Sequence, residues 1–138
     1  MLEELMVYLG YGHNVPLPDG VYIVKVDDSI EVAIYEYDQY LRFESVVAVM
    51  PSSDNLRKNI LVSLLQRSAR MVRYRREGIF AGRDGSTVYL QRNVVYLNFS
   101  VAGMAAENRD YVKSLYAWRA LAGVSVNNEN TTDVMNSH

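Results

Sequence analysis

Residues 21–26 read VYIVKV, residues 30–37 read IEVAIYEY, and residues 40–49 read YLRFESVVAV. These segments are rich in β-branched and aromatic residues. Their apolar side chains recur at every second position, as in a β-strand with one buried face. The connections at 27–29 and 38–39 are long enough only for tight turns. We therefore expect three consecutive antiparallel strands, because parallel neighbours need a much longer crossover.

Helical periodicity precedes and follows this region. Residues 1–11 place leucines and a methionine at helical spacing, and Gly10 is a suitable end for that helix. Residues 51–54 (PSSD) end the run of strands and offer an oxygen that can cap a second, leucine-rich helix. A third helix is expected to begin at residues 98–100 and to end at Gly123.

A second pair of strands lies between the last two helices. Residues 78–81 and 86–90 flank the turn at 82–85, which reads GRDG, and residues 94–97 extend the second of these strands. The order of elements is therefore α–β–β–β–α–β–β–α. This order predicts an α+β fold in which an antiparallel, twisted sheet is covered by helices.

The sequence also predicts how the chain is divided and which face of the sheet stays open. Helices should cover one face, and the alternation within residues 30–37 places Tyr35 and Tyr37 on the other. Monomers rarely leave a large apolar patch uncovered, so that face indicates a partner. We expect residues 1–125 to form one domain and residues 126–138 to form a disordered tail.

Composition restricts the class of protein. The chain has 138 residues, no cysteine and a formal net charge of −2. The lack of cysteine excludes a disulfide framework and a zinc–thiolate site, and it fits a reducing compartment. The longest uncharged apolar run, residues 45–50, is much shorter than the ~18 residues of a membrane span. Glu3 and Glu4 stand where a secretory signal would carry bases. We therefore expect a soluble cytoplasmic protein.

Few residues have the chemistry of catalysis or metal binding. His13 lies in a proline-containing loop, and a base there would need an orienting carboxylate and a substrate. Asp27 and Asp28 are adjacent, so in a strand they would point to opposite faces, and they lack calcium-loop spacing. Residues 82–86 lack the lysine and the following helix of a phosphate loop. We therefore expect no enzymatic activity and no cofactor or metal.

One local cluster of positive charge supports an alternative function. Five arginines fall within ten residues: Arg67, Arg70, Arg73, Arg75 and Arg76. With Tyr74 among them, they suit a nucleic-acid-binding or regulatory domain. The structural interpretation is that these arginines cover the flank and the C-terminal end of a helix, whose dipole favours cations. The acidity of the whole chain favours this second interpretation, since non-specific nucleic-acid affinity is mainly electrostatic.

Four local patterns resemble a known family. They are Leu-Gly at 9–10, VKVDDSIEVAI at 24–34, Met-Pro at 50–51 before the leucine-rich helix, and YAWR at 116–119. Together with the size, the acidity and the order of elements, they resemble the class I type III secretion chaperones, which bind effector proteins. The first helix is shorter than this family usually shows.

The resemblance implies a homodimer that binds an extended segment near the N-terminus of one or more secreted effectors. It implies that the client is kept competent for export without ATP. The residues then expected to contact the effector are Leu5, Leu9, Val24, Tyr35, Tyr37 and Phe43. Those expected at the dimer interface are Leu61, Leu64, Leu65 and Ile79.

Overall fold

The structure is a computed structural model of the chain, and it describes residues 2–10, 18–75, 77–83, 85–96 and 100–136. The side chains at 70–75 and 124–136 are not described. The elements are α1 (Leu2–Tyr8), β1 (Tyr22–Asp27), β2 (Ile30–Glu36), β3 (Tyr40–Val49), α2 (Asp54–Arg75), β4 (Glu77–Ala81), β5 (Thr87–Val95) and α3 (Val101–Asn136). This order confirms the α–β–β–β–α–β–β–α prediction.

The strands form one five-stranded antiparallel sheet in the order β1-β2-β3-β5-β4. The two predicted hairpin regions are joined by β3 and β5, which pair from Tyr40↔Val95 to Val49↔Thr87. The sequence did not reveal this pairing, because local turn signals say nothing of partners about 50 residues apart. In this arrangement β1 and β4 are the two edges of the sheet.

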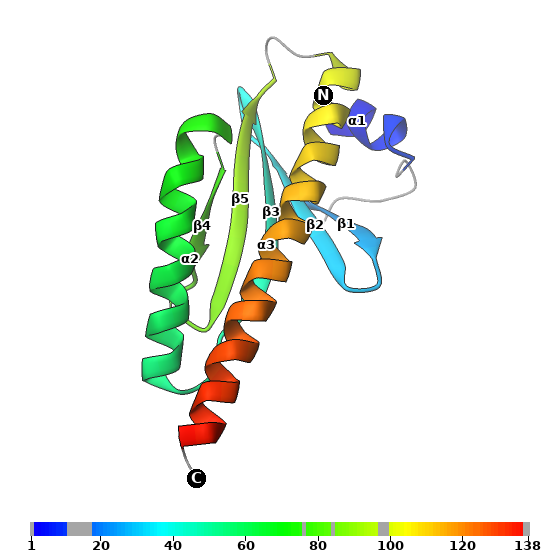
Figure 1. Ribbon diagram of the computed structural model, residues 1–138. Coiled ribbons are helices and arrows are strands. Elements are labelled where there is room, and N and C mark those ends of the chain that lie inside the picture. The colour runs from blue at the N-terminus through cyan, green and yellow to red at the C-terminus, as the bar shows by residue number, and fades with distance from the viewer. Residues whose placement is uncertain (1, 11–17, 76, 84, 97–99, 137–138) are drawn as a thin grey trace.

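All three helices lie on the same face of the sheet (Figure 1). α3 crosses β3 and β5, α2 runs beside β4, and α1 packs against α3. The side chains between the layers include Leu5, Ile34, Phe43, Leu90, Met104, Tyr111 and Leu115, each almost fully buried. Burying one large apolar side chain contributes about 1.5–3 kcal/mol, so this layer is the main source of stability.

The starts of α2 and α3 lie where the sequence predicts them. At the start of α2, the Arg57 amide donates to the Ser53 carbonyl at 2.9 Å. At the start of α3, the Gly103 amide donates to the Ser100 Oγ at 3.1 Å, which is an N-cap contact. The predicted starts of both helices are therefore confirmed.

The far end of α3 differs from the prediction. The helix does not end at Gly123 but continues to Asn136, so the predicted stop is wrong. A glycine weakens a helix by only about 1 kcal/mol and does not by itself end one. The division of the chain after residue 125 stays a prediction.

The turn between β4 and β5 is the predicted hairpin. Gly85 has φ +69°, a value at which a side chain would be strained, and its amide donates to the Gly82 carbonyl at 2.9 Å.

In the part of the chain that the structure describes, no helix combines the length and the apolarity needed to cross a membrane.

Candidate partner-binding surface

The sheet face opposite the helices carries the candidate site. Alternation along β2 sends Ile30, Val32 and Ile34 into the core, where all three are buried. The residues between them lie on the open face, as the sequence predicts. On β3 the buried Leu41 and Phe43 alternate in the same way with half-buried Arg42 and Glu44. The open face is therefore a mixed aromatic and charged surface.

A row of tyrosines runs across one end of this face. The ring centroids of Tyr35 and Tyr37 are 6.4 Å apart, and those of Tyr37 and Tyr40 are 4.7 Å apart. The Arg42 guanidinium lies 5.1 Å from the Tyr37 ring centroid and 5.9 Å from that of Tyr40. Its Nε donates to Asn93 Oδ1 at 2.9 Å. The row is thus held in place by stacking, cation–π contacts and a hydrogen bond.

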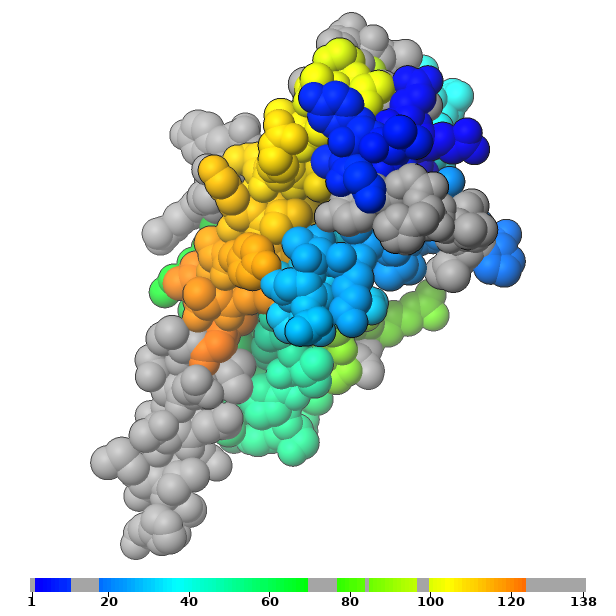
Figure 2. All heavy atoms as spheres, turned by 90° about the vertical axis from the view of Figure 1, so that its right-hand side faces the viewer, coloured from blue at the N-terminus to red at the C-terminus, as the bar shows by residue number. Residues whose placement is uncertain are grey.

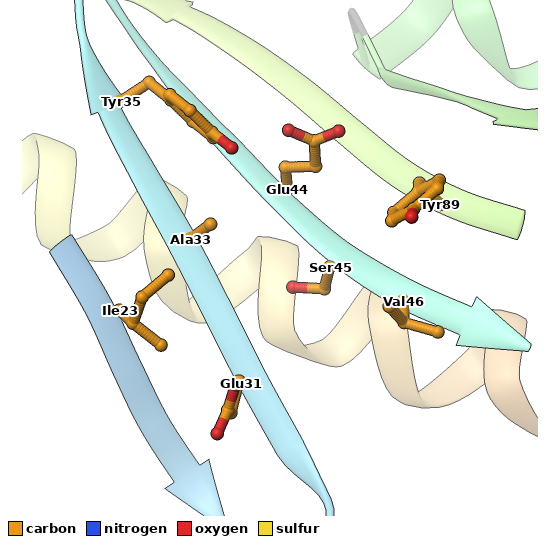
Figure 3. A pocket seen from close by; sticks show the side chains of 8 residues that line it. All are labelled: Ile23, Glu31, Ala33, Tyr35, Glu44, Ser45, Val46 and Tyr89. Carbon is orange, nitrogen blue, oxygen red and sulfur yellow. The ribbon is translucent and has the colours of Figure 1, made fainter. Parts of the chain in front are cut away.

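Next to this row lies a hollow of about 300 Å³, shown in Figure 3. Its lining comes from four strands and comprises Ile23, Glu31, Ala33, Tyr35, Glu44, Ser45, Val46 and Tyr89. The Tyr89 ring stacks on Phe80 with centroids 5.2 Å apart. These apolar and aromatic walls, with two carboxylates among them, are better suited to binding a side chain of a peptide than to catalysing a reaction.

Tyr35 and Glu44 meet at the edge of the hollow, where the phenol points toward the carboxylate (Figure 3). Burial, and secondly the negative charge of Glu44, raise the pKa of Tyr35. The phenol is therefore protonated throughout the physiological pH range and presents a hydrogen-bond donor.

The predicted effector contacts separate onto two faces. Tyr35 and Tyr37 lie on the open face, and Tyr37 is 38% exposed. Val24 and Phe43 lie under the helices, at 2% and 0% exposure. Phe43 is opposite Ile34 in the register and shares its core-facing side, so it lies on the other face of the sheet from Tyr35. Its contact with an effector stays a prediction.

The two predicted contacts in and just after α1 also differ in position. Leu5 is fully buried in the core, whereas Leu9 is half-buried at its margin. The exposed apolar side chains of this helix are Val7 and Tyr8. Helical spacing finds the apolar stripe, but it does not show which residues just beside the stripe remain accessible.

The predicted dimer contacts lie along α2 and β4. Leu64 and Ile79 are buried in the subunit's own core, and Leu61 is half-buried. Leu65 is 43% exposed, and its neighbour Val62 is 45% exposed. Among the described side chains of α2, the largely exposed apolar ones are Val62 and Leu65, with half-buried Leu61 beside them.

Most of the residues that the sequence suggested for alternative functions lie outside the described residues or have side chains that are not described. His13 and Arg76 fall outside the described residues, as do the side chains of Arg70, Arg73 and Arg75. Arg67 is exposed. Among the described residues, no three histidines, cysteines or acidic residues lie where they could hold a metal ion.

The tip of the β1–β2 hairpin is fastened to α3. The Asp27 carboxylate accepts hydrogen bonds from the Ser29 amide at 2.7 Å and from the Tyr116 hydroxyl. Arg119 donates to the carbonyls of Ser29, at 2.9 Å, and Val46, at 3.1 Å. Figure 2 shows this side, with the hairpin in light blue against the orange part of α3. These contacts hold β1 and β2, two of the strands that form the open face, against α3.

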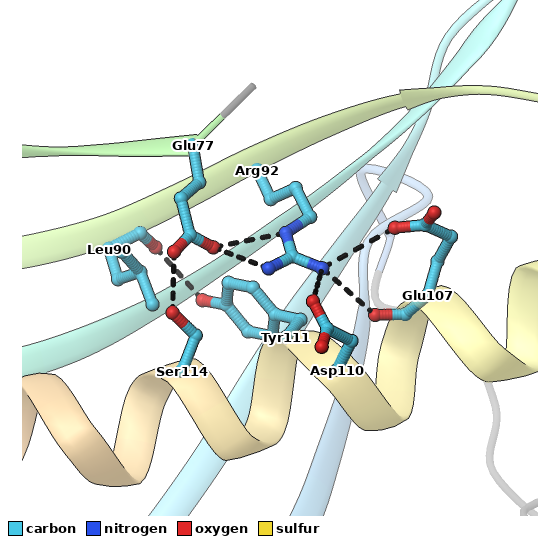
Figure 4. A network of polar contacts seen from close by, with 7 residues as sticks. All are labelled: Glu77, Leu90, Arg92, Glu107, Asp110, Tyr111 and Ser114. Carbon is cyan, nitrogen blue, oxygen red and sulfur yellow. Dashed lines mark hydrogen bonds and ion pairs between the residues drawn. The ribbon is translucent and has the colours of Figure 1, made fainter. Parts of the chain in front are cut away.

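A buried polar network joins β4, β5 and α3 (Figure 4). Arg92 lies 2.6 Å from Glu77 and 2.9 Å from Asp110. The Ser114 hydroxyl donates to the other Glu77 oxygen at 2.5 Å. Sequence reasoning missed this network, since it assigned no role to Glu77 or Arg92. A charged residue at a core-facing strand position was the available signal.

Comparisons with known proteins rest on structure alone. No family model and no curated protein matches the sequence. A chain of the ExsC–ExsE complex superposes with a TM-score of 0.68 at 14% identity, covering 88% of this chain and 90% of that one. A chain of the ExoU–SpcU complex of the type III secretion system of Pseudomonas aeruginosa gives 0.61 at 14% identity, over 88% and 97%.

A third similar structure is YbjN of E. coli, a proposed transcription regulator, with a TM-score of 0.53 at 10% identity over 95% and 90% of the two chains. At identities this low, the structural similarity shows a shared fold and nothing more. The function has to be argued from the surface.

Proposed function

We propose that this protein, which has the fold of the class I type III secretion chaperones, binds an extended N-terminal segment of one or more effector proteins. It keeps them competent for secretion in the bacterial cytoplasm, without ATP and without enzymatic activity. The observation that carries this proposal is the likeness, across most of the chain, to chains of the HopA1–SchA chaperone–effector complex and of the ExoU–SpcU complex of the type III secretion system.

The surface suits an extended client. β1 is an edge strand, so its outer backbone groups can pair with an added strand. Alternate side chains of the client would then reach the open face, where Tyr35 and Tyr37 offer flat aromatic surface. Contact over a large area offsets the conformational entropy that a disordered segment loses on binding.

The predicted contact residues take two roles in this proposal. Tyr35, Tyr37 and Leu9 touch the client. Leu5, Val24 and Phe43, which are buried, keep α1 and the sheet in place beneath it. Two subunits associate through the exposed apolar side of α2, with Leu64 and Ile79 supporting that side from within the core.

The test is a pull-down of the tagged, nuclease-treated protein from its native bacterium, with identification of the captured proteins by mass spectrometry. We expect one or a few secreted proteins, each protected from protease along a segment near its N-terminus. Recovery of only ribosomal or nucleoid proteins, lost after nuclease treatment, would instead favour the nucleic-acid-binding function of Arg67–Arg76.

A variant pair localises the client. Tyr35→Asp with Tyr37→Asp places two charges on the open face and should reduce client recovery at least about tenfold, since aromatic anchors dominate such interfaces. Ala106→Asp with Leu121→Asp, at exposed positions of α3, is the matched control for charge. Undiminished capture by the Tyr35/Tyr37 variant would move the binding site off this face.

A further inference from the structure

The hollow on the open face contains two carboxylates without a cationic partner. Within the described chain, neither Glu31 nor Glu44 forms an ion pair. Lys25 is opposite Glu31 in the strand register, but no contact of 4 Å or less joins them. The nearest arginine along β3, Arg42, is instead held by Asn93 and stacks against two tyrosines. Arg119 lines a neighbouring hollow together with Glu31, but its guanidinium donates to the Ser29 and Val46 carbonyls. Within the described chain, the two carboxylates are therefore open to an ion pair with a partner.

The surroundings of these carboxylates are apolar. Ile23 and Val46 are 38% and 37% exposed, and they flank the hollow together with the rings of Tyr35 and Tyr89 (Figure 3). A long cationic side chain matches this combination. Its aliphatic stem packs on apolar and aromatic groups while its charged end reaches a carboxylate.

We propose that this hollow receives a lysine or arginine side chain of the bound client segment, with its charge beside Glu31 and Glu44 and its stem against Ile23 and Val46. The inference rests on the proposed function and adds the chemistry of the client: an extended segment in which a basic residue stands between apolar ones. Charge complementarity carries it, and the same negative charge disfavours a nucleic-acid backbone.

The test uses a fluorescent synthetic peptide of alternating valine and lysine. A matched peptide carries Nε-acetyl-lysine, which keeps the shape and removes the charge. Three full-length proteins are compared by fluorescence anisotropy at low salt. They are the unchanged protein, the hollow variant Glu31→Gln with Glu44→Gln, and the control variant Glu3→Gln with Glu36→Gln. The control residues are exposed and lie outside the hollow.

We expect the hollow variant to bind the lysine peptide about tenfold more weakly than the unchanged protein, as the loss of two partly exposed ion pairs predicts. The control variant should bind it unchanged, and acetylation should abolish the difference between the proteins. Equal affinity of the hollow and control variants for the lysine peptide would overturn the inference. A change of oligomeric state in the hollow variant, measured by light scattering, would also overturn it, because a second copy would then occupy the hollow.

Client capture separates this inference from the proposed function. If the hollow variant retains the captured client as tightly as the unchanged protein, the basic-residue inference is wrong and the chaperone function stands. If the unchanged protein captures no secreted protein at all, the chaperone function is wrong whatever the peptides show.

Discussion

Single residues carry two kinds of electrostatic contact in this protein, and burial distinguishes them. The Arg92 and Glu77 side chains are 2% and 0% exposed, whereas Asp54 in the Arg57–Asp54 pair is 88% exposed. Removing one partner of a buried ion pair costs far more stability than removing one partner of a surface pair, because the remaining buried charge has neither a counter-ion nor water. Similar distances in the two pairs therefore do not imply similar contributions to stability.

Arg92→Met should destabilise the fold by about 3–5 kcal/mol, because it leaves the Glu77 carboxylate buried beside Ser114 without its cation. Urea unfolding followed by circular dichroism measures this. Arg57→Met is the matched control, with an expected loss below about 1 kcal/mol. Equal losses in the two variants would show that the network contributes no more than a surface pair.

The contact between Asp27 and α3 predicts a pH dependence. The hydrogen bond from Tyr116, followed by that from the Ser29 amide, lowers the pKa of Asp27 to about 2. A lowered pKa means that the fold favours the carboxylate. Its stabilising contribution is therefore complete above the unfolded-state pKa, near 3.8, and is lost as the pH falls through about 2.

Asp27→Asn should consequently flatten the decline of unfolding free energy between pH 4 and pH 2 relative to the unchanged protein. Urea titrations across that range provide the measurement, and Asp28→Asn, at the exposed neighbouring position, serves as control. If both variants show the slope of the unchanged protein, Tyr116 does not hold Asp27 in its ionised form.

At the scale of elements, α2 is the helix whose apolar side chains the subunit does not use fully. Ile60 and Leu64 face the core, while Val62 and Leu65 remain largely exposed. An exposed apolar patch of this kind is costly for a protein that stays monomeric. The proposed dimer is therefore expected to form through this side of α2.

Val62→Lys with Leu65→Lys should convert a dimer into a folded monomer, because two charges would have to be buried at the contact. Light scattering at micromolar concentration reports the mass, and circular dichroism reports the fold. Val7→Lys, at another exposed apolar position, should remain dimeric. A monomeric unchanged protein would refute the dimer before any variant is made.

Elements were also the scale at which the sequence was most informative. The alternation in β2 and the starts of α2 and α3 could be predicted, since period and capping are local properties. The position of Phe43 could not, because the correct face of β3 depends on its register with β2. The β3–β5 pairing and the Arg92 network are likewise long-range. A charged residue at a core-facing strand position indicates a buried charge, but no local pattern identifies its partners.

The whole molecule is one helix-covered sheet whose second face and one long helix side are free for partners. The candidate site depends on both distant pairings and local pattern, so its tyrosines were found from the sequence while the hollow beside them was not. The same fold occurs in chains of the ExsC–ExsE and ExoU–SpcU complexes and in YbjN.

The attachment of the β1–β2 hairpin to α3 has a consequence for synthesis in the cell. Its hydrogen bonds join residues 89 and 90 positions apart in the chain. A nascent chain thus exposes the hairpin long before Tyr116 and Arg119 have been translated. The open face reaches its final geometry only when the last helix leaves the ribosome. A truncated product would carry the tyrosines but would lack the α3 contacts that hold the hairpin in place.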